Sequence, residues 1–199
     1  MALVHGGGEV TVLHAELMNS GGIDVAVSAQ AVENVVVGVV CLAACAFDVR
    51  YRRIPNTLTV VTAVGGLIFA GVVAGLPGAG LSVAGCLVGA VLFFPLFALG
   101  GLGAGDVKLV AAIGAWVGPL DALWVCLYAA MAGGVMALVV ALTRGYARNM
   151  LRNLWFLGTY WRTQGVRPVP GLTLSEARSP RLAYALPISV GVIVALWWR

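Results

Sequence analysis

The sequence predicts an all-α, polytopic membrane protein with about six transmembrane helices, and three observations support this fold class. The chain is 61% hydrophobic and only 10% charged, whereas soluble domains carry roughly 25% charged residues. It contains 27 glycines, and glycine is more frequent in membrane helices than in soluble ones. Its apolar residues gather in long runs separated by short loops. A chain this apolar cannot cover its surface with polar groups, so we expect lipid to be its solvent.

Six apolar segments account for the predicted helices, since a membrane span needs roughly 17–25 residues. Prolines and glycines at residues 76–80, and Pro119 with Asp121, mark turns between segments. The first 30 residues are mixed in composition, so we expect a weakly structured lead-in at residues 1–30 and a membrane-embedded domain over residues 31–199. The six segments cover residues 25–47, 57–75, 81–100, 107–118, 122–143 and 182–198.

The basic residues predict the orientation of the chain in the membrane. Segment 107–118 is short for a span, so it either crosses the bilayer or dips and returns. If it crosses, the loops 48–56, 101–108 and 144–181 share one side, which then holds 11 of the 12 basic residues. The positive-inside rule favours crossing and places these loops in the cytoplasm of a bacterial inner membrane. The net charge of +4 therefore indicates membrane orientation, and we predict no nucleic-acid partner.

The cytoplasmic loop 144–181 begins with a stretch, Asn149 to Arg162, that mixes arginine with leucine and aromatic residues. This mixture is typical of an amphipathic helix lying on the inner leaflet, and a membrane anchor without a substrate role is its simplest function. Residues 167–171, Arg-Pro-Val-Pro-Gly, break the helix and start a linker.

The four cysteines all lie inside apolar runs, and none forms a CxxC pair. We expect them to be small buried hydrophobic residues. Cys41 and Cys45 share a helix face, but no further ligands at helical spacing accompany them. The sequence therefore predicts neither a metal site nor a cofactor.

Two carboxylates, Asp48 and Asp106, stand at the predicted cytoplasmic ends of apolar segments. Each has an ordinary structural interpretation. Asp48 can anchor the helix end beside Arg50, Arg52 and Arg53, because ionisable residues are tolerated at the interface. Asp106 follows a glycine turn and opens a helix, where aspartate is a natural cap.

Taken together, the two aspartates indicate a catalytic pair, because the predicted topology puts them on one side of the membrane at similar depth. Hydrolysis by an aspartic mechanism needs two carboxyl groups in one site. One, ionised, takes a proton from water, and the other, protonated, donates to the carbonyl oxygen. Glycines before Asp106 would let another backbone approach closely.

The residues around these aspartates resemble the two signature motifs of the type IV prepilin peptidases, which are GxGD membrane aspartic proteases. The first is Asp-x5-Ile-Pro-Asn with its aspartate at Asp48, and the second is Gly-x-Gly-Asp-x-Lys with its aspartate at Asp106. The resemblance implies that these two aspartates are catalytic. It also implies substrate-binding or supporting roles for Gly103, Gly105, Lys108, Pro55 and Asn56.

The resemblance further implies that the substrate is a prepilin or pseudopilin, with a short basic leader before an apolar helix, cut at the cytoplasmic face. The chain lacks the paired CxxC motifs of the large bifunctional members, so it looks like the small peptidase-only form of Flp/tight-adherence pilus systems, and we expect no N-methylation. Residues 184–191 match the family's final helix only loosely, so we assign them no catalytic role. The sequence does not determine the oligomeric state of the chain.

Three other functions stay open from the sequence. A transporter could use the two aspartates as a proton relay, although such sites usually lie near the bilayer midplane. A non-catalytic membrane scaffold would use them only as caps and anchors. Another GxGD-type intramembrane protease would share the aspartates and differ in substrate.

Overall fold

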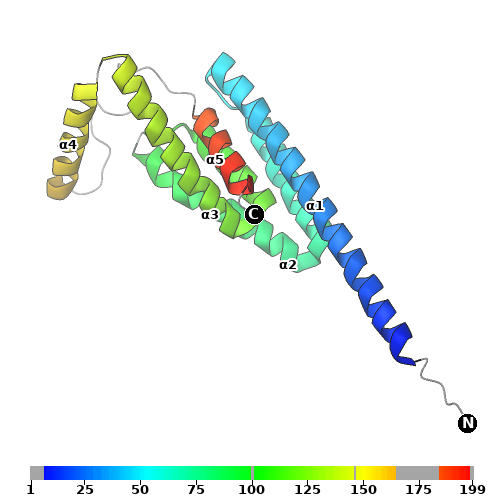
Figure 1. Ribbon diagram of the computed structural model, residues 1–199. Coiled ribbons are helices and arrows are strands. Elements are labelled where there is room, and N and C mark those ends of the chain that lie inside the picture. Colours follow the sequence, from blue (N-terminus) through cyan, green and yellow to red (C-terminus); the bar gives the residue numbers. More distant parts are fainter. Residues whose placement is uncertain (1–6, 100, 146, 165–183, 198–199) are drawn as a thin grey trace, which may run out of the picture. The chain divides into compact units, whose positions relative to one another are not determined.

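The protein is described here by a computed structural model covering residues 7–99, 101–145, 147–164 and 184–197. All regular secondary structure in these ranges is helical. The chain divides into two compact units, residues 1–36 and 37–199, and the second unit contains both aspartates. The helices are α1 (Gly7–Tyr51), α2 (Asn56–Ala98), α3 (Ala104–Thr143), α4 (Ala147–Gln164) and α5 (Ala185–Trp197) (Figure 1).

Three helical stretches in the described residues are long and apolar enough to cross a membrane: Ser28–Tyr51, Asn56–Ala98 and Ala104–Thr143. In the most apolar part of each stretch, only 28%, 22% and 28% of the residues are buried inside the protein. The remaining surface is apolar, which suits lipid and not water. The prediction of an all-α protein with membrane-spanning helices is confirmed, while the number of about six spans stays a prediction.

Helix α2 folds back on itself in its middle. Ala74 leaves the helical conformation and Gly75 has a φ of 63°, a value that glycine adopts without steric cost. A Cβ atom on Gly66 would lie 2.9 Å from the carbonyl oxygen of Ala115, and the Ser82 hydroxyl donates to that same oxygen at 2.7 Å. Two positions sixteen residues apart would be about 24 Å apart on a straight helix. The two legs of α2 therefore lie beside the same part of α3.

Helix α3 is also broken, at Gly118, which has a φ of 80° and precedes Pro119. A Cβ on Gly114 would lie 3.3 Å from the Cβ of Ala122, a separation that a straight helix does not allow over eight residues. The predicted turn near Pro119 is thus present as a sharp break. The other predicted turn lies at residues 74–75 and not at 76–80, because Gly75 accepts the positive φ and Pro77 fits the first turn of the next leg.

The legs of α2 and α3 pack closely because small residues line their interface. A Cβ on Gly85 would overlap the carbonyl oxygen of Gly114, and a Cβ on Gly114 would overlap that of Gly85. Helix α5 lies against α3 in the same way, with Gly191 facing Ala129 at close range. Such contacts are typical of helices in membranes, where small residues let backbones approach.

Two further sequence predictions concern the regions that contain α1 and α4. Helix α1 begins at Gly7 and so runs through most of the segment predicted to be weakly structured, since no proline interrupts residues 7–51. The division into domains at residue 30 stays a prediction. Helix α4 matches the helix predicted from Asn149 to Arg162, while the linker predicted at residues 167–171 lies outside the described residues.

The cysteines behave in part as predicted. Cys41 and Cys126 are buried, Cys45 and Cys86 are half-buried, and all four are free thiols.

Candidate active site

Asp48 stands at the end of a buried stripe on α1. The residues Val37, Cys41 and Ala44 recur at helical spacing before it, and their exposed fractions are 0%, 4% and 0%. Asp48 continues this face and is only 8% exposed. A carboxyl group placed among such residues needs hydrogen-bond partners, because a buried charge without them is costly.

A short loop connects α1 to α2 and contains the first two residues of the Ile-Pro-Asn element. Arg52 adopts a left-handed conformation with a φ of 54°, and its N–H donates to the backbone oxygen of Asp48 at 2.9 Å. This geometry ends a helix. Pro55 is extended, with φ −62° and ψ 134°, and caps α2, which begins at Asn56. The role of Pro55 is therefore to turn the chain, since its missing N–H costs nothing there.

Asp106 lies in the first turn of α3, with an exposed fraction of 9%. The N–H of Gly103 donates to Asp106 Oδ2 at 3.1 Å, and the N–H of Asp106 donates to the backbone oxygen of Gly103 at 3.1 Å. This reciprocal arrangement resembles a capping box. The capping interpretation of Asp106 is thus correct in kind, although Gly103 occupies the cap position and Asp106 the third helical position.

The two motifs meet through two contacts. A Cβ on Gly105 would lie 3.2 Å from the Cβ of Ile54, so the absence of a side chain at Gly105 lets the loops pack together. Lys108 Nζ donates to Asn56 Oδ1 at 2.9 Å. Loops that are separated by more than forty residues of α2 are therefore joined at one end of the bundle.

The start of α5 is a third element of the site. The backbone N–H of Ala185 donates to Asp48 Oδ2 at 3.1 Å. Tyr184 lies close enough to Asp106 for the charge of that carboxylate to act on its phenol group. The dipeptide Tyr184–Ala185 therefore neighbours both aspartates.

The two carboxyl groups are themselves electrostatic neighbours, since the charge of Asp48 acts on Asp106. Two carboxyl groups in one site can support hydrolysis when one is ionised and the other is protonated, because the first can accept a proton from water and the second can donate one to a carbonyl oxygen. In the described residues, no cluster of three or more His, Cys, Asp or Glu side chains could hold a metal ion.

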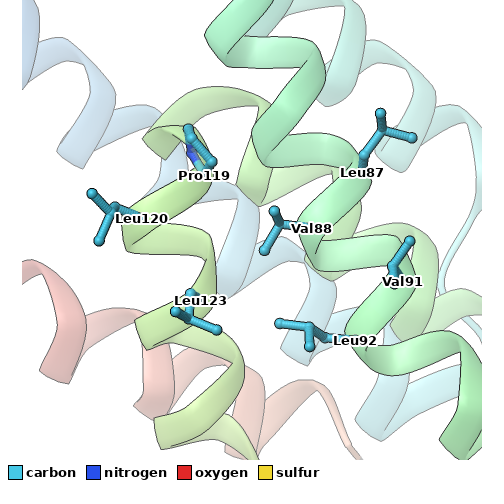
Figure 2. A pocket seen from close by; sticks show the side chains of 7 residues that line it. All are labelled: Leu87, Val88, Val91, Leu92, Pro119, Leu120 and Leu123. Atoms are coloured by element: carbon cyan, nitrogen blue, oxygen red, sulfur yellow. The ribbon is translucent and has the colours of Figure 1, made fainter.

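An apolar groove runs along the bundle between the second leg of α2 and the second leg of α3. Figure 2 shows Val88 and Leu92 on α2 facing Leu123 on α3 across it. Neither aspartate lines the groove, so we assign it no part in bond cleavage. Its lining residues are Leu87, Val88, Val91, Leu92, Pro119, Leu120 and Leu123.

Comparison with known proteins identifies the family. The model of the type IV leader peptidase family matches residues 35–138, which is half of the chain and includes Asp48 and Asp106. The chain belongs to the type IV leader peptidase family. Two proteins named prepilin leader peptidase/N-methyltransferase, from Burkholderia pseudomallei strains 1026b and K96243, are each 36% identical over 118 residues. No solved structure matches.

This member of the leader peptidase family spans about a third of the length of those curated relatives. The aligned region covers 54% of this chain and 36% of each relative. The family match ends at residue 138 and so does not reach α4 or α5.

Sequence reasoning missed the contribution of α5 to the site of this leader peptidase family member. Ala185 has no side chain that could mark it as functional, and its contact with Asp48 uses the backbone. One signal was available. The helix starts at Tyr184-Ala185 without a serine, threonine, asparagine or aspartate of its own to cap it, so its first N–H groups need a partner from another segment.

The contact between Lys108 and Asn56 leads to a first testable prediction. We expect Lys108→Met and Asn56→Ala each to lower peptidase activity by about three- to ten-fold, since one hydrogen bond contributes roughly 0.5–1.5 kcal/mol. The double variant should be no slower than the worse single variant, because both changes remove the same bond. Cleavage rates for the four proteins of this cycle provide the measurement. Additive losses would show that the two side chains act separately.

Proposed function

We propose that the chain is a membrane aspartic endopeptidase that removes the leader peptide from prepilins, with Asp48 and Asp106 activating the attacking water. The observation that supports this most is the pairing of two buried carboxyl groups, one from each motif, at one end of an apolar bundle. Membership of the leader peptidase family supports the class of reaction, and the names of the relatives support the substrate.

The proposed mechanism starts with one of the two aspartates ionised and the other protonated. The ionised carboxylate takes a proton from water, and the resulting hydroxide attacks the carbonyl carbon of the scissile peptide bond. The protonated carboxyl donates its proton to the carbonyl oxygen. Collapse of the tetrahedral intermediate then breaks the C–N bond: one of its hydroxyl groups returns a proton to the ionised carboxylate while the leaving amine takes the proton of the other carboxyl group, so the pair again holds one proton. No cofactor enters these steps.

We further propose that both aspartates face the cytoplasm of a bacterial inner membrane and that the chain crosses the bilayer about six times. The breaks at Gly75 and Gly118 support this, because each leg of α2 and α3 then becomes a separate span. A Cβ on Gly85 would lie 2.8 Å from the carbonyl carbon of Gly118, so the second leg of α2 passes close to the break in α3. The leg from Ala104 to Val117 is about 21 Å long, which implies local thinning of the bilayer.

The crossing number is testable with topology reporters. We expect an alkaline phosphatase fusion to be inactive after Arg53, Gly101 or Gly145, and active after Gly78 or Pro119. Inactive fusions at both Gly78 and Pro119 would contradict six crossings and favour dipping segments. Green fluorescent protein fusions at the same points give the complementary readout.

The proposed substrates are prepilins or pseudopilins, and the proposed biological setting is an Flp-type pilus system. The apolar helix of the substrate would lie against the bundle in lipid while its leader reaches the aspartates. Helix α4 is proposed to lie on the inner leaflet. Trp155 is 72% exposed on it, and Arg152 is exposed as well, a combination that suits the headgroup layer.

Co-expression with prepilins tests the function. We expect the wild-type chain to convert an Flp-type prepilin to a shorter form, and mass spectrometry of the product to give a new N-terminus at the leader boundary. A panel with longer type IV prepilins distinguishes pilus systems. If no prepilin in the panel is cut by folded protein, the proposed substrate is wrong, and another protease specificity or a non-proteolytic role takes its place.

A further inference from the structure

We propose that Ser189, acting with Cys45, is a positioning residue that holds the start of α5 on the carboxylate of Asp48. This inference rests on the proposed function, because it assigns Ser189 to the same site. Neither signature motif contains Ser189, and it does not touch the reacting groups. It acts through the backbone of Ala185.

The polar contacts around Ser189 form a continuous chain between α1 and α5. The Ser189 hydroxyl donates to the backbone oxygen of Ala185 at 2.8 Å, and Ser189 Oγ lies 3.1 Å from Cys45 Sγ. With its proton used on Ala185, the hydroxyl oxygen can accept from the Cys45 thiol. The N–H of Ala185 in turn donates to Asp48.

Helical spacing places these contacts next to the candidate active site. Cys45 lies three residues before Asp48 on α1, and Ser189 lies four residues after Ala185 on α5. Residues three and four apart on a helix are neighbours on one face. The contact between Cys45 and Ser189 is therefore one turn away from the contact between Asp48 and Ala185, and it fixes the same two helix faces.

The N–H of Ala185 restricts the orientation of the Asp48 carboxylate. It belongs to the first turn of α5, whose N–H groups have no acceptor within the helix and lie at the positive end of the helix dipole. Holding Oδ2 at 3.1 Å restricts rotation of the carboxylate. A catalytic carboxylate must be oriented within a narrow range to act on water, so the position of α5 along α1 matters for the chemistry.

The other side of α5 is fixed by close apolar packing on α3. A Cβ on Gly191 would lie 2.8 Å from the Cα of Ala129, and a Cβ on Gly133 would lie 3.3 Å from the ring of Tyr184. Apolar packing is not directional. The directional contact between Cys45 and Ser189 therefore supports the hydrogen bond from Ala185 to Asp48 in setting the position of α5 along α1.

Kinetics of Ser189→Ala test the proposal. We expect kcat for prepilin cleavage to fall about three- to ten-fold with KM within two-fold of wild type, because one oriented hydrogen bond is lost. Ser189→Thr keeps the hydroxyl and should restore most of kcat. Ser82→Ala is the matched control, since Ser82 also donates from a buried site to a backbone oxygen, that of Ala115, away from the aspartates. It should change thermal stability and leave kcat near wild type.

A cross-linking measurement tests the geometry without activity. In a Cys41→Ala background, Ser189→Cys should form a disulfide with Cys45 under mild oxidation, and the same variant with Cys45→Ala should not. If wild type cuts no prepilin, the proposed function fails, and cross-linking alone decides whether Ser189 faces Cys45. If wild type cuts prepilin but Ser189→Ala retains full kcat, or if only KM changes, the positioning role is wrong while the proposed function stands. Absence of the disulfide in folded protein would also overturn it.

Discussion

Replacing Asp48 or Asp106 with asparagine is expected to lower the rate of prepilin cleavage by about 10³-fold or more while preserving the fold. An amide can neither take a proton from water nor donate one as an acid, and a positioned acid–base group contributes roughly 10²–10⁴-fold to a rate. The amide oxygen of asparagine can still accept from Ala185 at position 48 and from Gly103 at position 106. Both structural contacts therefore survive, so a lower cleavage rate reports the loss of acid–base chemistry and not a change in structure.

The measurement is the initial rate of leader removal in membranes with matched protein levels, together with the melting temperature in detergent. The double variant should be no slower than the slower single variant, because residues that act as a unit are not additive. Asp121→Asn, at the break in α3, is the matched control and should cleave at the wild-type rate. If a single variant cleaves within ten-fold of the wild-type rate, that aspartate has no catalytic role. If both variants do so, the two aspartates are structural, as a membrane scaffold would require.

Local signals in the sequence were enough to predict an all-helical chain and the approximate positions of both motif loops. The breaks in α2 and α3 fall close to the predicted turns because glycine and proline act locally, through φ and the missing N–H. That the Asp106 carboxylate accepts a free N–H at the start of α3 was predictable for the same reason, although the cap position itself falls on Gly103 and Asp106 is the third helical residue. The expectation that the two aspartates share one site came from the predicted topology, in which each stands where an apolar segment meets its loop, and it stays a prediction.

The contacts between segments distant in sequence could not be predicted in this way. Nothing in the residues around Ile54 shows that it packs on Gly105, because that contact depends on how the legs of α2 return to α3. The contact of Asp48 with Ala185 uses a backbone N–H, which every residue except proline possesses. The start of α1 at Gly7 was missed because its mixed composition gives no apolar stripe, whereas a helix only needs the absence of breakers.

Gly114→Ala is expected to destabilise the folded bundle by about 1–3 kcal/mol, the usual cost of forcing extra volume into a packed interface. A Cβ on Gly114 would overlap the carbonyl oxygen of Gly85, and two helix backbones would have to separate to admit it. This contact lies between the second leg of α2 and the first leg of α3, the leg that begins at Ala104 and carries Asp106 in its first turn. We therefore expect a melting temperature lower by several degrees in detergent and a parallel loss of cleavage.

Gly134→Ala is the matched control on the same helix. A Cβ there would meet no atom within 4 Å, and alanine favours a helix over glycine by up to about 1 kcal/mol. Its melting temperature should be unchanged or slightly higher. Gly85→Ala probes the clash from the other side, because its Cβ would overlap the carbonyl oxygen of Gly114. If Gly114→Ala melts like Gly134→Ala, the two backbones do not approach this closely, and the small-residue interface between α2 and α3 is wrong.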